Sequence, residues 1–267
     1  MSADRYLAVD GARLRYRDEG NGTAVILVHG WTLDLDMWEP QARALQERFR
    51  VIRFDRRGFG LSSGQPSLNG DIDDIDALAL GLDVSRFALL GMSQGARPCL
   101  QFALARQESL GCLILDGCPP VLGEPGPPEI LPLIAHYREL VATQGMAAFL
   151  STWKAHPLMQ LRTDVLLHRE LLDKIISRYP GNDLMQADTD KARDVSAENL
   201  RGLGVPVLLM TGEHELPERT EVANTLASLM PNAQRAITPR AGHLSNLDNS
   251  GQYNEILLCF LQQHRVG

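Results

Sequence analysis

The chain has no long run of apolar residues. Its first residues (MSADRYLAVDG) hold no apolar stretch of the length that a signal peptide needs, and no later run approaches the length that crosses a bilayer. Positive charge is also scarce, because 33 acidic residues outnumber 26 lysines and arginines and the net charge is −7. Such a surface does not attract a polyanion. These absences predict a cytoplasmic protein that binds neither a membrane nor a nucleic acid, and they leave its oligomeric state open.

Cysteines are few, and motifs for a metal or a nucleotide are missing. The spacing of the four cysteines matches no zinc pattern and indicates a reducing compartment. We expect all four to be small core residues: Cys99, Cys112, Cys118 and Cys259. The chain contains no Gly-x-Gly-x-x-Gly and no Gly-Lys-Ser/Thr motif of the kind that binds nucleotide phosphates. The sequence therefore predicts no metal and no cofactor.

What is present is the pattern of a soluble α/β protein. Of the 267 residues, 44% are hydrophobic and 22% are charged, which is an ordinary globular composition. Short apolar runs alternate with segments of helical periodicity. Strands are expected at 6–9, 13–17, 24–28, 51–54, 87–90, 112–115, 205–210 and 235–238, and helices at 39–47, 71–82, 94–106, 220–229 and 252–263. This alternation predicts a mostly parallel, twisted sheet of about eight strands with helices on both faces, entered through an antiparallel hairpin.

The alternation stops between residues 119 and 200. Residues 119–132 are crowded with prolines and include two glycines, which is typical of a loop, and residues 133–200 show only helical periodicity. In open α/β sheets, ligands bind beyond the carboxyl ends of the strands. We therefore expect a helical lid (cap) insertion at 119–200 in a core domain formed by 1–118 and 201–267.

A serine stands between two glycines at Gly91–Gly95 (GMSQG), where an expected strand meets an expected helix. A match this short also arises by chance, and a strand-to-helix turn often needs a glycine for structural reasons alone. In this context, however, a sharp turn would strain the serine backbone and expose its hydroxyl above the sheet. The glycines let strand and helix pass closely, and a helix N-terminus favours developing negative charge. The pattern indicates that Ser93 is a nucleophile.

Further motifs stand in a recognisable order with this serine. The set comprises Val28–Trp31 (VHGW), Asp55–Gly60 (DRRGFG), Gly91–Gly95, Thr211–Glu215 (TGEHE) and Gly242-His243. With these motifs in this order and spacing, the chain resembles the α/β-hydrolase family over nearly its whole length. The resemblance implies the fold already expected from the strand and helix pattern. It also implies that Asp55–Gly60 is a structural turn with an aspartate–arginine network.

The resemblance assigns roles to the matching residues. Ser93 is the expected nucleophile and His243 the general base, since a serine needs a base to become nucleophilic. The expected oxyanion hole consists of the backbone N–H groups of Trp31 and Gln94, and two such donors stabilise a tetrahedral intermediate. His29 precedes the serine in the chain, which is the wrong order for the base, and we expect it to bind substrate.

The acid of the site departs from the usual pattern. The family generally has an aspartate three residues after Gly212, and this chain has Glu215 there. A glutamate can also orient the imidazole, and some members use one. Asp116, which follows the strand at 112–115, is a rival because some relatives place the acid after that strand. We expect Glu215 to contact His243, with Asp116 as the alternative and Glu213 as a further option.

Such a site performs acyl transfer: attack on a carbonyl, formation of an acyl-enzyme, then attack by water. Hydrolysis of a carboxylic ester or a lactone is therefore the expected activity, and residues 35–41 after the His-Gly pair also look like enol-lactonases. The partner is a small-molecule substrate. A non-catalytic relative that binds a ligand is a second possibility, but such proteins usually lose the serine or the histidine.

A third possibility is a lyase of the same fold. Arg97, Trp153 and the stretch 156–158 (HPL) are similar to a menaquinone-pathway synthase, in which the serine–histidine pair acts as a base to eliminate pyruvate. In those relatives an arginine at the position of Arg97 helps to bind substrate carboxylates, but Met92 replaces their tyrosine. Arg97 also fits a structural ion pair, and Trp153 also fits the core of a lid. We expect both to bind substrate.

Overall fold

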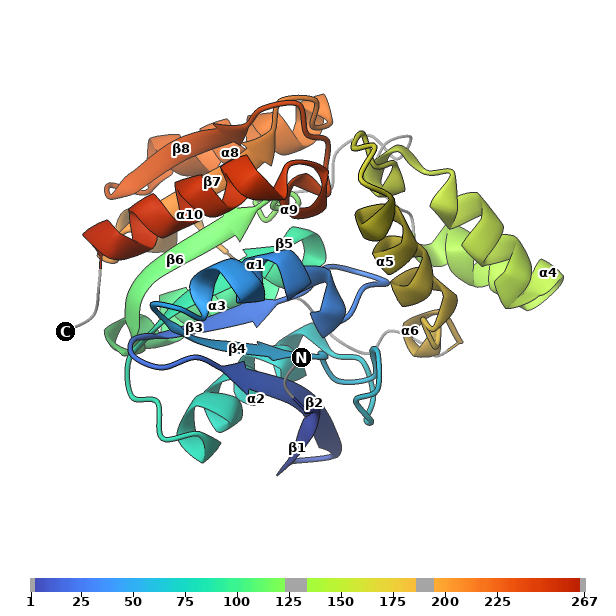
Figure 1. Cartoon of the computed structure of the whole chain (residues 1–267), viewed down its shortest axis with the longest axis horizontal. Helices are drawn as coiled ribbons and strands as arrows, with labels where there is room; N and C mark the ends of the chain where they lie inside the picture. Colours follow the sequence, from blue (N-terminus) through green and yellow to red (C-terminus); the bar gives the residue numbers. More distant parts are fainter. Residues whose placement is uncertain (1–2, 123–133, 186–194, 265–267) are drawn as a thin grey trace.

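The computed structural model describes residues 3–122, 134–185 and 195–264. In this part of the chain a single eight-stranded sheet has the order β1-β2-β4-β3-β5-β6-β7-β8 (Figure 1). The strands are β1 (Arg5–Val9), β2 (Ala12–Glu19), β3 (Ala24–Val28), β4 (Arg50–Phe54), β5 (Phe87–Met92), β6 (Leu110–Asp116), β7 (Val207–Gly212) and β8 (Ala233–Thr238). Only β1–β2 and β2–β4 pair antiparallel, and β4 to β8 form parallel pairs. The predicted α/β fold with an antiparallel hairpin at one edge is confirmed.

Helices cover both faces of this sheet, as predicted. Successive side chains of a strand point to opposite faces. Val25 and Leu27 therefore pack into a cluster with α1 (Glu39–Leu45) and α10 (Ser250–Gln263). Ile26 packs into the other cluster, which holds apolar residues of α2 (Leu68–Gly81), α3 (Ala96–Arg106) and α8 (Pro217–Leu229). All five residues of β3 are buried, as a strand covered on both faces requires.

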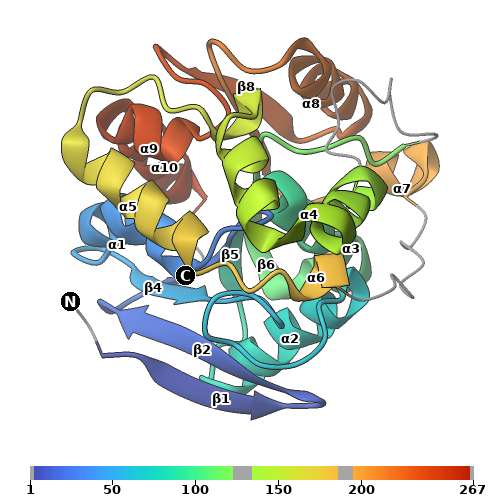
Figure 2. The ribbon, with the colours of Figure 1, turned by 90° about the vertical axis from the view of Figure 1, so that its right-hand side faces the viewer.

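The described residues between β6 and β7 contain helices and no strand. They form α4 (Ile134–Lys154), η4 (Pro157–Met159), α5 (Leu166–Ser177), α6 (Asn182–Met185) and α7 (Ala197–Arg201). Figures 1 and 2 show α4, α5 and α6 together beyond the carboxyl ends of the parallel strands. We call residues 134–185 the helical segment. Most of the expected proline-rich loop, residues 123–132, lies outside the described residues.

The described ranges also contain short helices: η1 (Leu35–Trp38), η2 (Ser93–Gly95), η3 (Gln107–Ser109) and α9 (Ser245–Asp248). None of the helices in the described ranges is both long and apolar enough to span a membrane.

Several elements differ by two or three residues from the expected bounds, and one cysteine differs from its expected placement. Helix α2 begins at Leu68 rather than residue 71, because the Ser67 side chain caps it by accepting a hydrogen bond from the Gly70 N–H at 2.8 Å. Cys259 is exposed, whereas the other three cysteines are buried. The core placement of Cys259 was wrong because α10 turns Leu257 and other apolar residues inward and leaves Cys259 on its outer side.

Candidate active site

Ser93 occupies a strained turn between β5 and α3. Strand β5 ends at Met92, and Ser93 begins the short helix η2. Its φ is +52°, in the left-handed region that few residues other than glycine adopt. The residue is 9% exposed. The sharp strand-to-helix turn that the motif predicts is therefore present.

The glycines around this serine are required by close backbone contacts. A Cβ on Gly91 would lie 2.5 Å from the Gly95 carbonyl oxygen, and one on Gly95 would overlap the carbonyl oxygen of His29. A Cβ on Gly30 would lie 3.3 Å from the Ser93 Cβ. Any larger residue would thus separate strand from helix. The same contacts bring the loop after β3 against Ser93.

His243 lies between Ser93 and a carboxylate. Its Nε2 is 2.9 Å from the Ser93 Oγ, and its Nδ1 is 2.7 Å from the Glu215 Oε2. The imidazole is 4% exposed. Because the carboxylate accepts, Nδ1–H donates to Glu215 and leaves Nε2 free to accept the serine proton. Three loops, which follow β5, β7 and β8, supply one residue each to this hydrogen-bonded chain.

Glu215 is held as an ionised acceptor. Its second oxygen, Oε1, accepts a hydrogen bond from the Leu216 N–H at 2.8 Å. Burial alone would raise its pKa, but His243, this backbone N–H and the Arg219 guanidinium together hold the pKa of Glu215 below its usual value. An ionised carboxylate here fixes the imidazole tautomer and stabilises an imidazolium.

The rival carboxylate, Asp116, does not reach the histidine. It lies at the end of β6 and accepts the Ser245 hydroxyl at 3.3 and 3.2 Å from its two oxygens. Burial and the nearby charge of Glu215 raise the pKa of Asp116 well above its usual value. Glu213 points elsewhere and accepts the Arg240 N–H at 2.7 Å. Of the acids weighed from the sequence, the structure brings Glu215 to His243.

The two expected oxyanion positions both lie beside the serine. Gln94 directly follows Ser93 in η2, and its side-chain Oε1 accepts from the Arg56 guanidinium at 2.9 Å. Trp31 follows Gly30, the residue packed against Ser93. The Trp31 side chain turns away from the sheet toward the helical segment, where its Nε1–H donates to Asp183 Oδ2 at 2.5 Å.

Both ring nitrogens of His29 have backbone partners. His29 is 0% exposed. Its Nε2 accepts the Arg56 N–H at 2.9 Å, so Nδ1–H donates to the Gly30 carbonyl at 2.8 Å. Burial, reinforced by the charge of Arg56, lowers the pKa of His29 to about 3. Backbone groups use both ring nitrogens, and the neutral ring fixes the loop after β3. The substrate contact of His29 stays a prediction.

Arg97 and Trp153 lie in different surroundings. Arg97 donates to the Pro120 carbonyl at 2.7 Å, and within the described ranges it forms no ion pair. Burial lowers the pKa of Arg97. Trp153, on α4, is buried and donates its Nε1–H to the Thr32 Oγ1 at 2.7 Å. Its ring centroid lies 4.7 Å from that of Trp31. Substrate contacts of both residues stay predictions.

Arg56 supports the site, and the sequence indicated only a structural turn at this position. Its guanidinium binds the buried carboxylate of Asp71 at 2.6–2.7 Å and also holds Gln94. Its backbone N–H donates to His29. Arg56 thus connects the loop after β3 to the turn after Ser93. The DRRGFG motif was the available signal, but it does not specify which arginine turns inward.

Asp248 supports the histidine loop and was missed. Its Oδ2 accepts the Gly242 N–H at 2.7 Å. Its Oδ1 accepts the N–H groups of Arg162 and Thr163 at 2.6 and 3.1 Å. One carboxylate therefore joins the residue before His243 to the helical segment. No local pattern distinguishes this aspartate from a surface acid.

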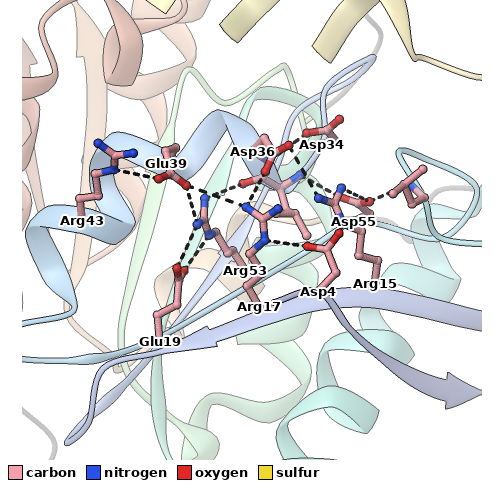
Figure 3. Close-up of polar contacts among 12 residues, drawn as sticks. Asp4, Arg15, Arg17, Glu19, Asp34, Asp36, Glu39, Arg43, Arg53 and Asp55 are labelled. Atoms are coloured by element: carbon pink, nitrogen blue, oxygen red, sulfur yellow. Dashed lines mark hydrogen bonds and ion pairs between the residues drawn. The ribbon is translucent and has the colours of Figure 1, made fainter. Parts of the chain in front are cut away.

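The expected aspartate–arginine network around Asp55 is present and extends beyond the turn. Figure 3 shows it spanning β2, β4 and η1. Asp55 pairs with Arg15 at 3.2 Å, and burial together with the nearby carboxylate of Asp34 raises the pKa of Asp55 to about 7. Arg178, which directly follows α5, binds Asp34 and Asp36 at 2.5–2.8 Å. The network thus anchors the helical segment to the core.

Known proteins resemble this chain in sequence and in fold. The family model described as "alpha/beta hydrolase fold" matches residues 23–250. A pimeloyl-[acyl-carrier protein] methyl ester esterase of Aliivibrio fischeri is 26% identical and covers 94% of this chain and 98% of its own. A non-heme haloperoxidase of Rhodococcus erythropolis is 26% identical, and the match covers 96% of this chain and 98% of its own. The solved structure of a thermophilic esterase from Thermogutta terrifontis has a TM-score of 0.79 at 25% identity and covers 99% of this chain and 100% of its own.

Proposed function

Because this chain belongs to the alpha/beta hydrolase fold family, we propose that it is a serine hydrolase that cleaves a carboxylic ester or a lactone. The observation that carries the proposal is the continuous chain of hydrogen bonds from Ser93 Oγ through His243 to Glu215. A nucleophile bonded to a base, which is itself oriented by a third group, is the arrangement of covalent acyl transfer. The esterase relatives support the same class of reaction.

The reaction follows from the positions of these atoms. His243 Nε2 accepts the Ser93 proton as Oγ attacks the substrate carbonyl, and Glu215 stabilises the imidazolium that forms. The backbone N–H groups of Trp31 and Gln94 stabilise the oxyanion; losing one such donor typically costs about 10²–10³ in rate. When the intermediate collapses, His243 protonates the leaving alkoxide. Water then hydrolyses the acyl-enzyme by the same steps.

The insertion at 119–200 is proposed as the lid of this site, with the core formed by 1–118 and 201–267. Its described helices α4–α6 lie beyond the carboxyl ends of the strands, where ligands bind in such sheets. Trp153 brings the segment against Thr32, next to the proposed oxyanion loop. We propose that the lid determines which substrates fit the site. In this proposal Trp153 contacts the acyl or the alcohol group of the substrate.

A second candidate is a lyase that uses Ser93 and His243 as a base. One observation favours it: Arg97 forms no ion pair within the described ranges and is buried enough to bind a substrate carboxylate strongly. The intact serine–histidine–glutamate chain argues against a third candidate, a relative that only binds a ligand.

Hydrolysis of a panel of p-nitrophenyl esters and lactones tests the proposed function. Wild-type protein should turn over at least one member, and Ser93→Ala should lose on the order of 10⁴–10⁶ of that turnover because the nucleophile is gone. Circular dichroism should show that Ser93→Ala keeps its fold. A pure Ser93→Ala sample that hydrolyses the ester at the wild-type rate would refute the assignment of the nucleophile.

A further inference from the structure

The side chain of Trp31 is surrounded by aromatic rings of the helical segment. Its ring centroid lies 4.7 Å from that of Trp153, 5.8 Å from that of Tyr137 and 5.9 Å from that of Phe149. All three partners belong to α4. The backbone of Trp31 belongs to the loop after β3, but its side chain is therefore packed in a different part of the molecule.

A carboxylate orients this side chain. Asp183, in α6, accepts the Trp31 Nε1–H on Oδ2 at 2.5 Å and the Tyr179 hydroxyl on Oδ1. The Asp183 backbone carbonyl accepts two N–H groups of Arg138, at 3.0 and 3.2 Å. The carboxylate is thus held in one orientation, and hydrogen bonds to an ionised acceptor are stronger than neutral ones.

We propose that Asp183 is a positioning residue, which acts through Trp31 to set the direction of the Trp31 backbone N–H in the oxyanion hole. The inference rests on the proposed function. On the other side of Trp31, the neutral His29 ring holds the Gly30 carbonyl. With the preceding carbonyl and the indole both held, the Trp31 peptide has little freedom to rotate. A displacement of about 1 Å at such a group can cost about 10² in rate.

Docking of the helical segment does not depend on this carboxylate alone. Arg178 binds Asp34 and Asp36, and the Asn182 side chain donates to the Gly58 carbonyl at 3.0 Å. These contacts hold the end of α5 and the start of α6 on the core. Loss of the Asp183 carboxylate should therefore remove the hydrogen bond that orients the Trp31 indole while the segment stays attached.

Two substitutions at Asp183 and one matched control test this. Asp183→Ala should lower kcat by about 10–10²-fold, with KM changed by less than about threefold, because the donor acts on the oxyanion of the transition state. Asp183→Asn should recover most of kcat, since an amide oxygen still accepts the indole N–H. Asp173→Asn removes an exposed carboxylate whose ion pair, among the described residues, is with Lys154 of the same segment, and it should behave as wild type. A loss that appears only in KM would refute the proposal.

A double-mutant cycle with Trp31→Phe asks whether Asp183 acts through the indole. Phenylalanine keeps an aromatic ring in the cluster and removes the Nε1–H. If the two residues act as one unit, Trp31→Phe/Asp183→Ala should be no slower than the slower single variant. Losses in kcat that simply multiply would overturn the proposal, because Asp183 would then act by another route.

An activity-independent measurement separates this inference from the proposed function. The chain has three tryptophans, so the ¹H–¹⁵N spectrum should show three indole signals, and the signal missing in Trp31→Phe identifies Trp31. That signal should move upfield in Asp183→Ala and stay in place in Asp173→Asn. An unmoved signal would refute the contact. If Ser93→Ala retained full hydrolysis while the signal moved, the proposed function would fail and the contact would stand.

Discussion

The proposed site has two parts, the serine–histidine–glutamate chain and the oxyanion position at Trp31, and they are held in different ways. Ser93, Glu215 and His243 lie on the loops after β5, β7 and β8, and His243 bonds directly to the other two. Trp31 depends instead on the helical segment, through Asp183, which is 152 positions away in sequence, and through packing on Trp153. Direct hydrogen bonds between loops of the core hold the serine–histidine–glutamate chain, whereas the side chain of Trp31 is held by the helical segment.

We expect the largest loss of activity when a residue of the serine–histidine–glutamate chain is replaced. Glu215→Gln keeps the shape but removes the charge that orients His243, and we expect kcat to fall by roughly 10³–10⁴. Asp116→Asn is the matched control, because Asp116 is an equally buried carboxylate at the end of the adjacent strand and contacts Ser245 rather than the histidine. It should keep kcat within about tenfold of wild type.

Steady-state kinetics on the best p-nitrophenyl ester measure both variants. The reverse order of effects would make Asp116 the acid of the site while leaving Ser93 and His243 in their roles.

Arg178→Met should affect stability more than catalysis. The substitution removes charged hydrogen bonds to Asp34 and Asp36 at the edge of the network in Figure 3. We expect a loss of about 1–3 kcal/mol in the free energy of unfolding. The loss in kcat should be smaller than that of Asp183→Ala, since the contact of Asp183 with Trp31 remains. Urea unfolding measures the first quantity; an unchanged midpoint would show that the segment is anchored elsewhere.

The smallest effect concerns His29 and appears only as a pH dependence of stability. Its pKa is about 3 in the folded protein against an ordinary value of 6.5. Between these values the unfolded chain binds a proton that the folded protein does not, so this residue makes stability fall as the pH drops below about 6.5. The effect is absent above that pH.

Removing the His29 imidazole should therefore make the free energy of unfolding depend less steeply on pH. His29→Gln should show a shallower decline of unfolding free energy between pH 6.5 and pH 5 than wild type, by up to about 1.4 kcal/mol per pH unit. Other titrating groups are common to both proteins and cancel in the difference. Denaturant unfolding at several pH values measures the two slopes. Equal slopes would show that the ring is not held neutral.

The difference between contacts of neighbouring residues and contacts of remote residues also explains what the sequence could predict. Strand–helix alternation indicates the sheet, and the serine flanked by glycines marks the strained turn, because both depend on neighbours in the chain. With the family resemblance, the position of Glu215 three residues after Gly212 favoured it as the partner of His243 and left Asp116 as the alternative. Each of these features lies in a short stretch of sequence, and the end of the preceding strand sets the geometry of that stretch.

The supporting residues could not be predicted because their partners are remote. Asp183 and Asp248 are single acids whose contacts form only after the helical segment packs on the core. The surroundings of His29 are a further example. Its neutral, fully bonded state depends on the backbone of Arg56, which arrives from another strand.

Covalent labelling by a fluorophosphonate probe tests the central claim most directly, because the reaction needs an activated serine and no knowledge of the substrate. Peptide mass spectrometry should find one adduct, on Ser93. Labelling should be absent in Ser93→Ala and slowed by several orders of magnitude in His243→Ala, in which the serine has lost its base. Wild-type protein that stays unlabelled, or a His243→Ala variant labelled at the wild-type rate, would contradict the account.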